Sequence, residues 1–294
     1  MALVSKSTEY FSGFDPRMIP GCILWLDGTD SATITGTTQV TQWTDKSSNA
    51  YAFTRKSTGF PNVSNMPFSD LNGLFIGSNA ALANSNIPIP TDYTFFAVAN
   101  RPGSNGSYGY LAKMNTAADF FGFVGVQNEQ NSFATFVGTN GLWRDVASNV
   151  PKKCITELPT LIGCVLSGAT LTPYWNGEPM TNKTGTATAT TGMTIGDAAT
   201  TTFGQPWLGI IGEVLMFSNA LSSNHRQQIE GYLTWKWKLR REDPYTNWAT
   251  GSSPQTFNPT SVSGIALWLD ASDTSTLTLS GSNVTGWTDK SGLG

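Results

Sequence analysis

The stretch WLGIIGEVLMFSNALSSNHRQQIEGYLTWKW, residues 207–237, changes its periodicity halfway along its length. Its first part, Gly209–Phe217, is a short apolar run bounded by turn residues, which is typical of a β-strand. A turn at NALS follows, and the remainder has the period of a helix. The sequence therefore predicts a strand, a turn and a helix in direct succession.

The predicted helix covers residues 223–238, with Ser222 or Ser223 as its N-cap. Lysines and arginines gather at its end, where they interact favourably with the helix dipole. One apolar stripe recurs at helical spacing and predicts the face that packs on the rest of the protein. The stripe consists of Ile229, Tyr232, Leu233 and Trp237.

The rest of the region up to residue 241 is a series of short apolar segments separated by turn residues, which predicts an all-β sandwich with this single C-terminal helix. The dipeptide Asn140-Gly141 predicts a type I′ hairpin turn, because both residues tolerate a positive φ. The other expected strands are residues 22–26, 40–43, 51–54, 73–76, 93–99, 120–126, 132–138, 142–146, 160–167, 170–175 and 193–196.

An internal repeat is the strongest long-range signal. The blocks GCILWLDGTDSATIT and VTQWTDKSS near the N-terminus return near the C-terminus as GIALWLDASDTSTLT and VTGWTDKSG. The repeat spans a whole domain, so it indicates module duplication and not a solenoid.

The repeat predicts four regions. Residues 1–14 form an N-terminal arm, residues 15–241 the first module, and residues 242–257 a linker rich in Pro, Gly and Ser. Residues 258–294 match only the start of the module, so we expect them to begin a second, incomplete copy and the chain to be a fragment of a longer protein.

Six motifs of the first module together carry a resemblance to a known family. They are LWLD (24–27), WTDKS (43–47), NGLFIGSNAAL (72–82), TFFAVANR (94–101), LTPYWNGEP (171–179) and the stretch 207–237. Through them the chain resembles the concanavalin A-like lectin/glucanase superfamily in its laminin G-like jelly-roll branch, over nearly all of the first module. The resemblance implies two antiparallel sheets and, commonly, glycan or protein binding. Similar modules recur in large surface proteins of bacteria, phages and giant DNA viruses.

Composition points to an exterior surface. Charged residues make up 13% of the chain and the net charge is −3, which gives no basic footprint for nucleic acid. The odd number of cysteines, Cys22, Cys154 and Cys164, implies no disulfide framework, and we interpret all three as small buried apolar residues. No signal peptide or membrane span is evident. We expect a location on a virion or extracellular surface, reached without a classical signal peptide.

An enzyme is not expected. Retaining glycosidases need two carboxylates about 5–5.5 Å apart, and the pattern Glu-x-Asp-x-x-Glu that supplies them on one strand is absent. Glu213 stands alone in its strand, so we interpret it as a structural carboxylate paired by backbone or hydroxyl donors. The single histidine, His225, leaves no His-based triad or multi-histidine metal site.

No cofactor is expected, although calcium stays open as a ligand. The favoured alternative is that Asp27 and Asp45, which follow strands in both copies, cap turns. The candidate calcium ligands are Asp27, Asp30, Asp45, Asp197 and Asn176.

Sugar binding requires an exposed aromatic ring beside hydrogen-bonding groups. Most tryptophans are better explained as core, including Trp25, Trp43 and Trp237. Two hypotheses remain: a non-catalytic recognition module that binds glycan or a host surface, and a structural capsid or fibre protein that packs against other subunits. The candidate ligand-binding residues, each beside a predicted turn, are Trp143, Trp175, Asn176 and Trp207.

Overall fold

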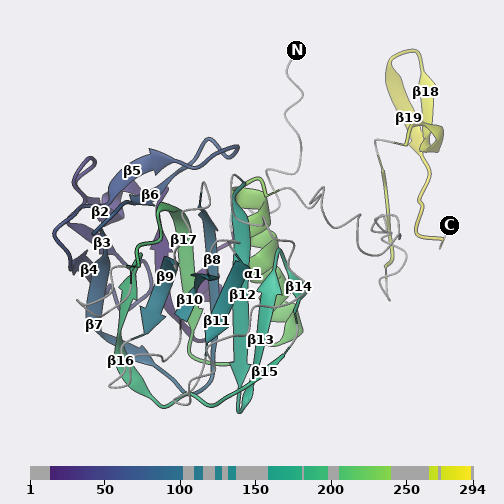
Figure 1. Ribbon diagram of the computed structural model, residues 1–294. Helices are drawn as coiled ribbons and strands as arrows, with labels where there is room; N and C mark the ends of the chain where they lie inside the picture. Colours follow the sequence, from purple (N-terminus) through teal and green to yellow (C-terminus); the bar gives the residue numbers. More distant parts are fainter. Residues whose placement is uncertain are drawn as a thin grey trace. The chain divides into compact units, whose positions relative to one another are not determined.

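A computed structural model describes the chain as two compact units, residues Met1–Arg241 and Glu242–Gly294 (Figure 1). Within the described ranges, no helix has both the length and the apolar character needed to span a bilayer. The described residues are 14–101, 109–114, 123–127, 132–136, 158–180, 182–197, 205–239, 265–270 and 273–292.

The first unit contains a nine-stranded antiparallel sheet built around one strand, β17. β17 is buried at every position, and it pairs with β8 along one edge and with β6 and then β1 along the other. In order, the strands are β14 (Glu178–Pro179), β13 (Thr170–Trp175), β12 (Thr160–Ser167), β8 (Tyr93–Asn100), β17 (Gly209–Phe217), β6 (Asn72–Ile76) and β5 (Asn62–Asn65), with β1 (Cys22–Asp27) paired to β17 and β15 (Lys183–Thr184) paired to β13.

A second sheet of eight antiparallel strands faces the first one. The two-sheet sandwich predicted from the sequence is therefore confirmed. In order, the strands are β11 (Ser132–Phe136), β10 (Phe123–Gln127), β9 (Gly109–Met114), β16 (Thr190–Ile195), β7 (Leu82–Ile89), β4 (Ala52–Arg55), β3 (Gln42–Thr44) and β2 (Ile34–Thr35).

Two hydrophobic cores hold this unit together. The larger one lies between the sheets and includes Trp43 and Phe95, neither of which has exposed surface. The smaller one lies where the helix α1 covers the outer face of the nine-stranded sheet, and it includes Phe96 and Leu215. Because β17 contributes to both cores, its sequence is apolar throughout and does not alternate.

Helix α1 runs over Ser223–Lys236, and Ser222 is its N-cap. The predicted stripe is buried throughout, which confirms its packing. The helix ends two residues earlier than predicted because Lys238 adopts a left-handed conformation at φ 52. The backbone N–H of Lys238 then bonds to Trp235 O, and that of Leu239 to Thr234 O, as in a Schellman motif.

The sequence did not predict β7, whose LANSNIPI segment is polar in the middle and contains a proline. The side chains of Ser85 and Asn86 are exposed, so the strand lacks the apolar signal on which sequence prediction relies. The predicted strand at residues 142–146 and the Asn140-Gly141 turn lie outside the described residues.

The second unit contains a short helical turn, η7 (Thr274–Thr276), and the hairpin of β18 (Leu277–Ser280) and β19 (Asn283–Trp287). Residues 265–270, where the repeat predicts a strand, form no sheet in this unit. Their counterpart in the first unit, β1, is a strand because β17 supplies its hydrogen bonds. The described part of the second unit contains no strand equivalent to β17.

Candidate functional site

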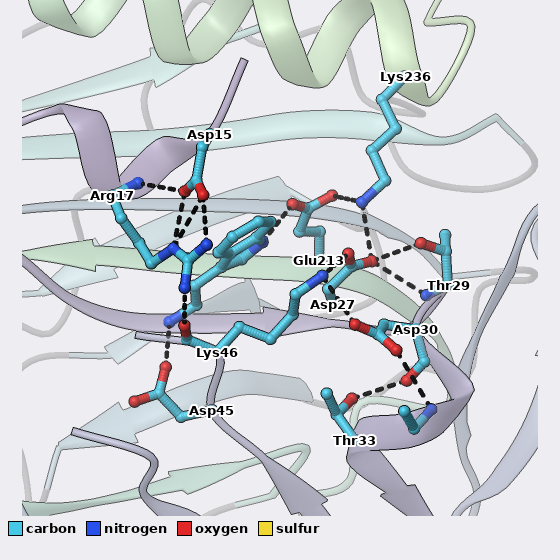
Figure 2. A network of polar contacts seen from close by, with 12 residues as sticks. Asp15, Arg17, Asp27, Thr29, Asp30, Thr33, Asp45, Lys46, Glu213 and Lys236 are labelled. Carbon is cyan, nitrogen blue, oxygen red and sulfur yellow. Dashed lines mark hydrogen bonds and ion pairs between the residues drawn. The ribbon is translucent and has the colours of Figure 1, made fainter. Parts of the chain in front are cut away.

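A buried carboxylate, Glu213, lies at the centre of a polar network in the first unit (Figure 2). The β17–β8 register shifts between Ile211 and Glu213, an irregularity of the kind that redirects a side chain. Glu213 has no exposed surface. Its Oε1 accepts hydrogen bonds from Trp25 Nε1 at 2.7 Å and from the Tyr232 hydroxyl at 2.9 Å, and its Oε2 accepts one from Trp237 Nε1 at 2.7 Å.

Lys236, in the last turn of α1, connects this carboxylate to a second one. Its Nζ lies 2.8 Å from Glu213 Oε2 and 2.8 Å from Asp27 Oδ1, and it donates a hydrogen bond to the Tyr232 hydroxyl at 3.2 Å. Burial raises the pKa of Glu213, and the attraction of Lys236 acts in the opposite direction. Burial, together with the Glu213 charge, also raises the pKa of Tyr232, so its hydroxyl acts as a donor.

Asp27, at the end of β1, receives donors on both of its oxygens. Its Oδ1 accepts hydrogen bonds from Thr29 N at 3.0 Å and Thr29 Oγ1 at 2.7 Å, and Lys46 Nζ lies 3.0 Å from its Oδ2. Burial disfavours the ionised carboxylate, but the two lysines and Thr29 outweigh it and hold the pKa of Asp27 below its ordinary value.

Lys46 extends the network toward the surface. Its Nζ also lies 2.9 Å from Asp30 Oδ2 and 4.2 Å from the centre of the Trp25 ring. Burial opposes its charge, but hydrogen bonds to Asp30 and Asp27 raise the pKa of Lys46. Trp25 therefore packs under a cation while its own N–H points inward to Glu213.

The candidate calcium ligands serve as turn caps in the structure. Asp45 accepts hydrogen bonds from Trp25 N at 2.6 Å and Ser47 N at 2.8 Å, and Asp27 caps its own turn through Thr29 N, as the sequence predicted for both. Asp30 is the N-cap of the helical turn η3 (Ser31–Thr33).

The two remaining calcium candidates bond to backbone groups in other parts of the unit. Asp197 accepts a hydrogen bond from Gln205 N at 2.6 Å, and Asn176 accepts one from Leu161 N at 3.0 Å. Across the described ranges, no three carboxylate, histidine or cysteine side chains are grouped to hold a metal ion.

The second copy rebuilds the outer part of the same network. Lys290 Nζ lies 3.0 Å from Asp270 Oδ2, the distance found between Lys46 and Asp27. Trp268 N donates to Asp289 Oδ1 at 2.7 Å, as Trp25 N donates to Asp45. The conserved local geometry shows that the LWLD and WTDKS blocks fold as one local unit.

Comparison with known proteins gives likeness in structure only. No model of a known protein family matches the chain, and no curated protein matches it. A Trypanosoma rangeli sialidase in complex with sialic acid superposes with a TM-score of 0.51 at 12% identity, over 73% of this chain and 33% of the sialidase chain. A second structure of a Trypanosoma rangeli sialidase also gives 0.51, at 10% identity, over 78% of this chain and 37% of that chain.

These likenesses show a shared β-sandwich fold. This chain spans about a third of the length of each of these two sialidase chains. Domain 4 of an extracellular arabinanase from Geobacillus stearothermophilus, in complex with arabinotriose, is matched over 98% of its length, with a TM-score of 0.49 and 10% identity.

The tryptophans named from the sequence as sugar-binding candidates do not form a common platform in the described structure. Trp175 belongs to the inter-sheet core with 8% of its surface exposed, because alternate residues of β13 point inward. Trp207 has no exposed surface, and its Nε1 donates to Asn100 O at 2.9 Å. Asn176 forms a turn at φ 48. Trp143 lies outside the described residues.

The described cysteines and the histidine belong to no reactive cluster. Cys164 is buried, and burial raises the pKa of the half-buried Cys22 to about 12. His225 lies in the first turn of α1, where its backbone N–H bonds to the N-cap Ser222. Cys154 lies outside the described residues.

Sequence reasoning missed the triad of Glu213, Lys236 and Asp27. Asp27 and Lys236 are 209 positions apart and meet only because α1 crosses the end of β1. One signal existed: each copy of the repeat pairs an aspartate with a lysine, Asp27 with Lys46 and Asp270 with Lys290.

Proposed function

We propose that the first unit is a non-catalytic recognition module of the laminin G-like type, on a virion or cell exterior, that binds a glycan or host surface. The β-sandwich fold and the low charge of the chain support this proposal. The specific branch of the superfamily and the exterior location are parts of the proposal.

The burial of Glu213 is the observation that supports a non-catalytic role for this module. A glycosidase acid must reach the sugar, but Glu213 is fully buried and both of its oxygens accept hydrogen bonds. The nearby Asp27 is 3% exposed and is held to Glu213 by the same ammonium of Lys236. The ammonium of Lys236 therefore occupies the space between the two carboxylates, where a glycosidic bond would have to lie.

A polar patch on the eight-stranded sheet supports the proposal that the module binds a glycan. Trp43 and Phe53 pair across β3 and β4 and point into the core, so their neighbours point outward. Gln42, Thr44 and Thr54 are the polar residues among these neighbours, and Gln42 Nε2 donates to Thr44 Oγ1 at 3.0 Å. We call these three residues the β3–β4 polar face. Its amide and hydroxyl groups match the hydrogen-bonding chemistry of sugar hydroxyls.

A glycan array probed with the full chain tests this proposal. We expect binding to at least one glycan class, and the double substitution of Gln42 and Thr54 by alanine to weaken it on the order of 30-fold, because two hydrogen bonds of about 1 kcal/mol are lost. Thr170→Ala, which removes an exposed threonine from β13, is the matched control and should leave affinity unchanged. An array with no signal contradicts glycan recognition.

The non-catalytic half is tested with β-glucan substrates. We expect no hydrolysis by the full chain. Turnover that disappears in Glu213→Gln contradicts the proposal, because it would place the buried carboxylate in a reaction.

One observation favours the alternative, a structural component that packs against other subunits. In the second unit the side chains of Leu267, Leu279 and Val284 are more than half exposed, at 62%, 58% and 54%. Apolar side chains gathered in so small a unit favour burial against another surface. Light scattering over a concentration series distinguishes the alternatives: ordered assembly without glycan binding supports the structural role.

A further inference from the structure

We propose that Lys236 and Asp27 condense into an intramolecular amide, an isopeptide bond, with Glu213 carrying the proton. The bond joins the last turn of α1 to the end of β1. It is a single self-modification and requires no other substrate, so it is independent of the ligand-binding proposal.

The three reacting groups are already in contact. Lys236 Nζ lies 2.8 Å from Asp27 Oδ1, so the carboxyl carbon is one bond beyond that oxygen, and the same Nζ lies 2.8 Å from Glu213 Oε2. Holding reactants in such geometry replaces a slow bimolecular encounter by an effectively unimolecular step. Lys236 therefore contacts both the carboxyl group that it would attack, on Asp27, and a proton acceptor, Glu213, and amide formation requires both.

The surroundings of Glu213 favour its protonated form. Glu213 has no exposed surface, and the indoles of Trp25 and Trp237 and the ring of Tyr232 cover it. A low-dielectric site disfavours a charged carboxylate, so Glu213 accepts a proton there more readily than it would in water. Burial raises the pKa of Glu213 in agreement with this transfer.

The donors around Asp27 prepare its carboxyl for attack. Lys46 Nζ contacts Oδ2, and Thr29 offers its backbone N–H and hydroxyl to Oδ1. As Nζ bonds to the carboxyl carbon, negative charge grows on these oxygens, and donors already in place stabilise it. The low pKa of Asp27 reflects two nearby ammonium groups, and one of them disappears when Lys236 gives up its proton.

The step balances. The Nζ–carbon bond of the amide forms and a carbon–oxygen bond of the Asp27 carboxyl breaks. Two of the three ammonium protons leave with that oxygen as water, and the third stays on the amide nitrogen. Glu213 accepts a proton from the ammonium and returns it to the departing oxygen, so it ends the step unchanged, and no oxidant or reductant is needed.

Two other lysine–aspartate pairs serve as internal comparisons. Lys46 also contacts Asp27, but hydrogen bonds to Asp30 and Asp27 raise its pKa and keep it an ammonium. Lys290 and Asp270 in the second unit are about one quarter exposed, and the described residues of that unit include no glutamate. We therefore expect one amide per chain.

Mass spectrometry of the full chain tests the proposal. We expect the folded chain to weigh one water less than its sequence. Trypsin should then fail to cut after Lys236 and should release a branched peptide in which residues 18–46 are joined to residues 227–238. A chain of full mass that is cut after Lys236 overturns the proposal.

Three variants assign the roles. Lys236→Met and Asp27→Ala should keep the full mass, and Glu213→Gln should keep it or lose water far more slowly. Lys238→Met is the control, because Lys238 pairs with the exposed Asp70 and should leave the water loss intact. A Glu213→Gln chain that loses water as fast as the parent overturns the role of Glu213. If a variant does not fold, the branched peptide of the parent chain still decides whether the bond exists.

Discussion

Glu213 illustrates how a residue can be placed correctly by sequence while its partners are not. The sequence predicted a structural carboxylate paired by backbone or hydroxyl donors, and the Tyr232 hydroxyl is one such donor. The indole of Trp25, 188 positions away, and the ammonium of Lys236 were not predicted. Their contacts depend on the crossing of α1 over β1 and β17, which no local pattern records.

The pH dependence of stability should report the burial of Glu213. Its pKa is raised in the folded state, so its protonated form is favoured there, and the stability that it contributes is complete below the ordinary value of 4.5 and lost as the pH rises through the folded pKa. We expect Glu213→Gln to remove this decline. Urea unfolding in a series of buffers from acidic to neutral pH measures it.

The Glu213→Gln profile must be compared with that of the parent chain, because other carboxylates change the stability with pH in the opposite direction. Asp27 and Asp15 have lowered pKa values, and their contributions are lost as the pH falls. Thr170→Ala, at an exposed residue without a titratable group, is the control for the effect of substitution itself. A Glu213→Gln profile parallel to that of the parent contradicts the prediction.

At the scale of elements, the strand and the helix of the stretch 207–237 were predicted well, whereas β7 and β9 were not predicted. Strand β17 was predicted with the bounds that it has, and α1 differed only at its C-terminal end. Strand β7 was missed because its exposed centre carries serine and asparagine in place of β-branched residues. The packing of α1 on β17 further depends on Gly212, where an added Cβ would lie 2.6 Å from the Trp237 ring.

Replacing Trp237 by alanine should destabilise the first unit by about 3–5 kcal/mol, because the ring is fully buried and its removal leaves a cavity. It also deprives Glu213 of a hydrogen-bond donor. Chemical unfolding followed by circular dichroism measures the loss. Met18→Ala, at a 70% exposed side chain, is the control and should leave the midpoint in place. An unchanged midpoint for Trp237→Ala would show that the helix stripe does not pack as described.

At the scale of the whole molecule, the two copies of the repeat differ in what covers them. Trp43 is completely buried in the first unit, while its counterpart Trp287 is 43% exposed in the second. The hydrogen bonds of Asp45 and Asp289 are nevertheless alike, so the local turn forms without a sandwich around it. The sequence revealed the duplication, but the loss of strand structure at residues 265–270 follows from the tertiary context.

Because the two units are separate bodies of contacts, we expect the first to keep its stability without the second. The free energy of unfolding of a chain of residues 1–241 should lie within about 0.5 kcal/mol of that of the first unit in the full chain, since distant, independent parts contribute additively. Calorimetry of both chains measures this. A clearly lower transition for the shorter chain would show that residues 242–294 stabilise the sandwich.

The meeting of β1 and α1 also determines how the first unit would respond to a pull along the chain. The Phe14 ring lies 5.4 Å from the Tyr232 ring, and Leu239 packs on the same cluster as Phe14. A pull on the chain at Phe14 and at Leu239 would therefore act on neighbouring points of the unit. Its shortest path runs from β1 through Asp27 and Lys236 into α1. While that link holds, the strands other than β1 carry little of the load. An amide there would therefore let the unit transmit force along the chain without unfolding.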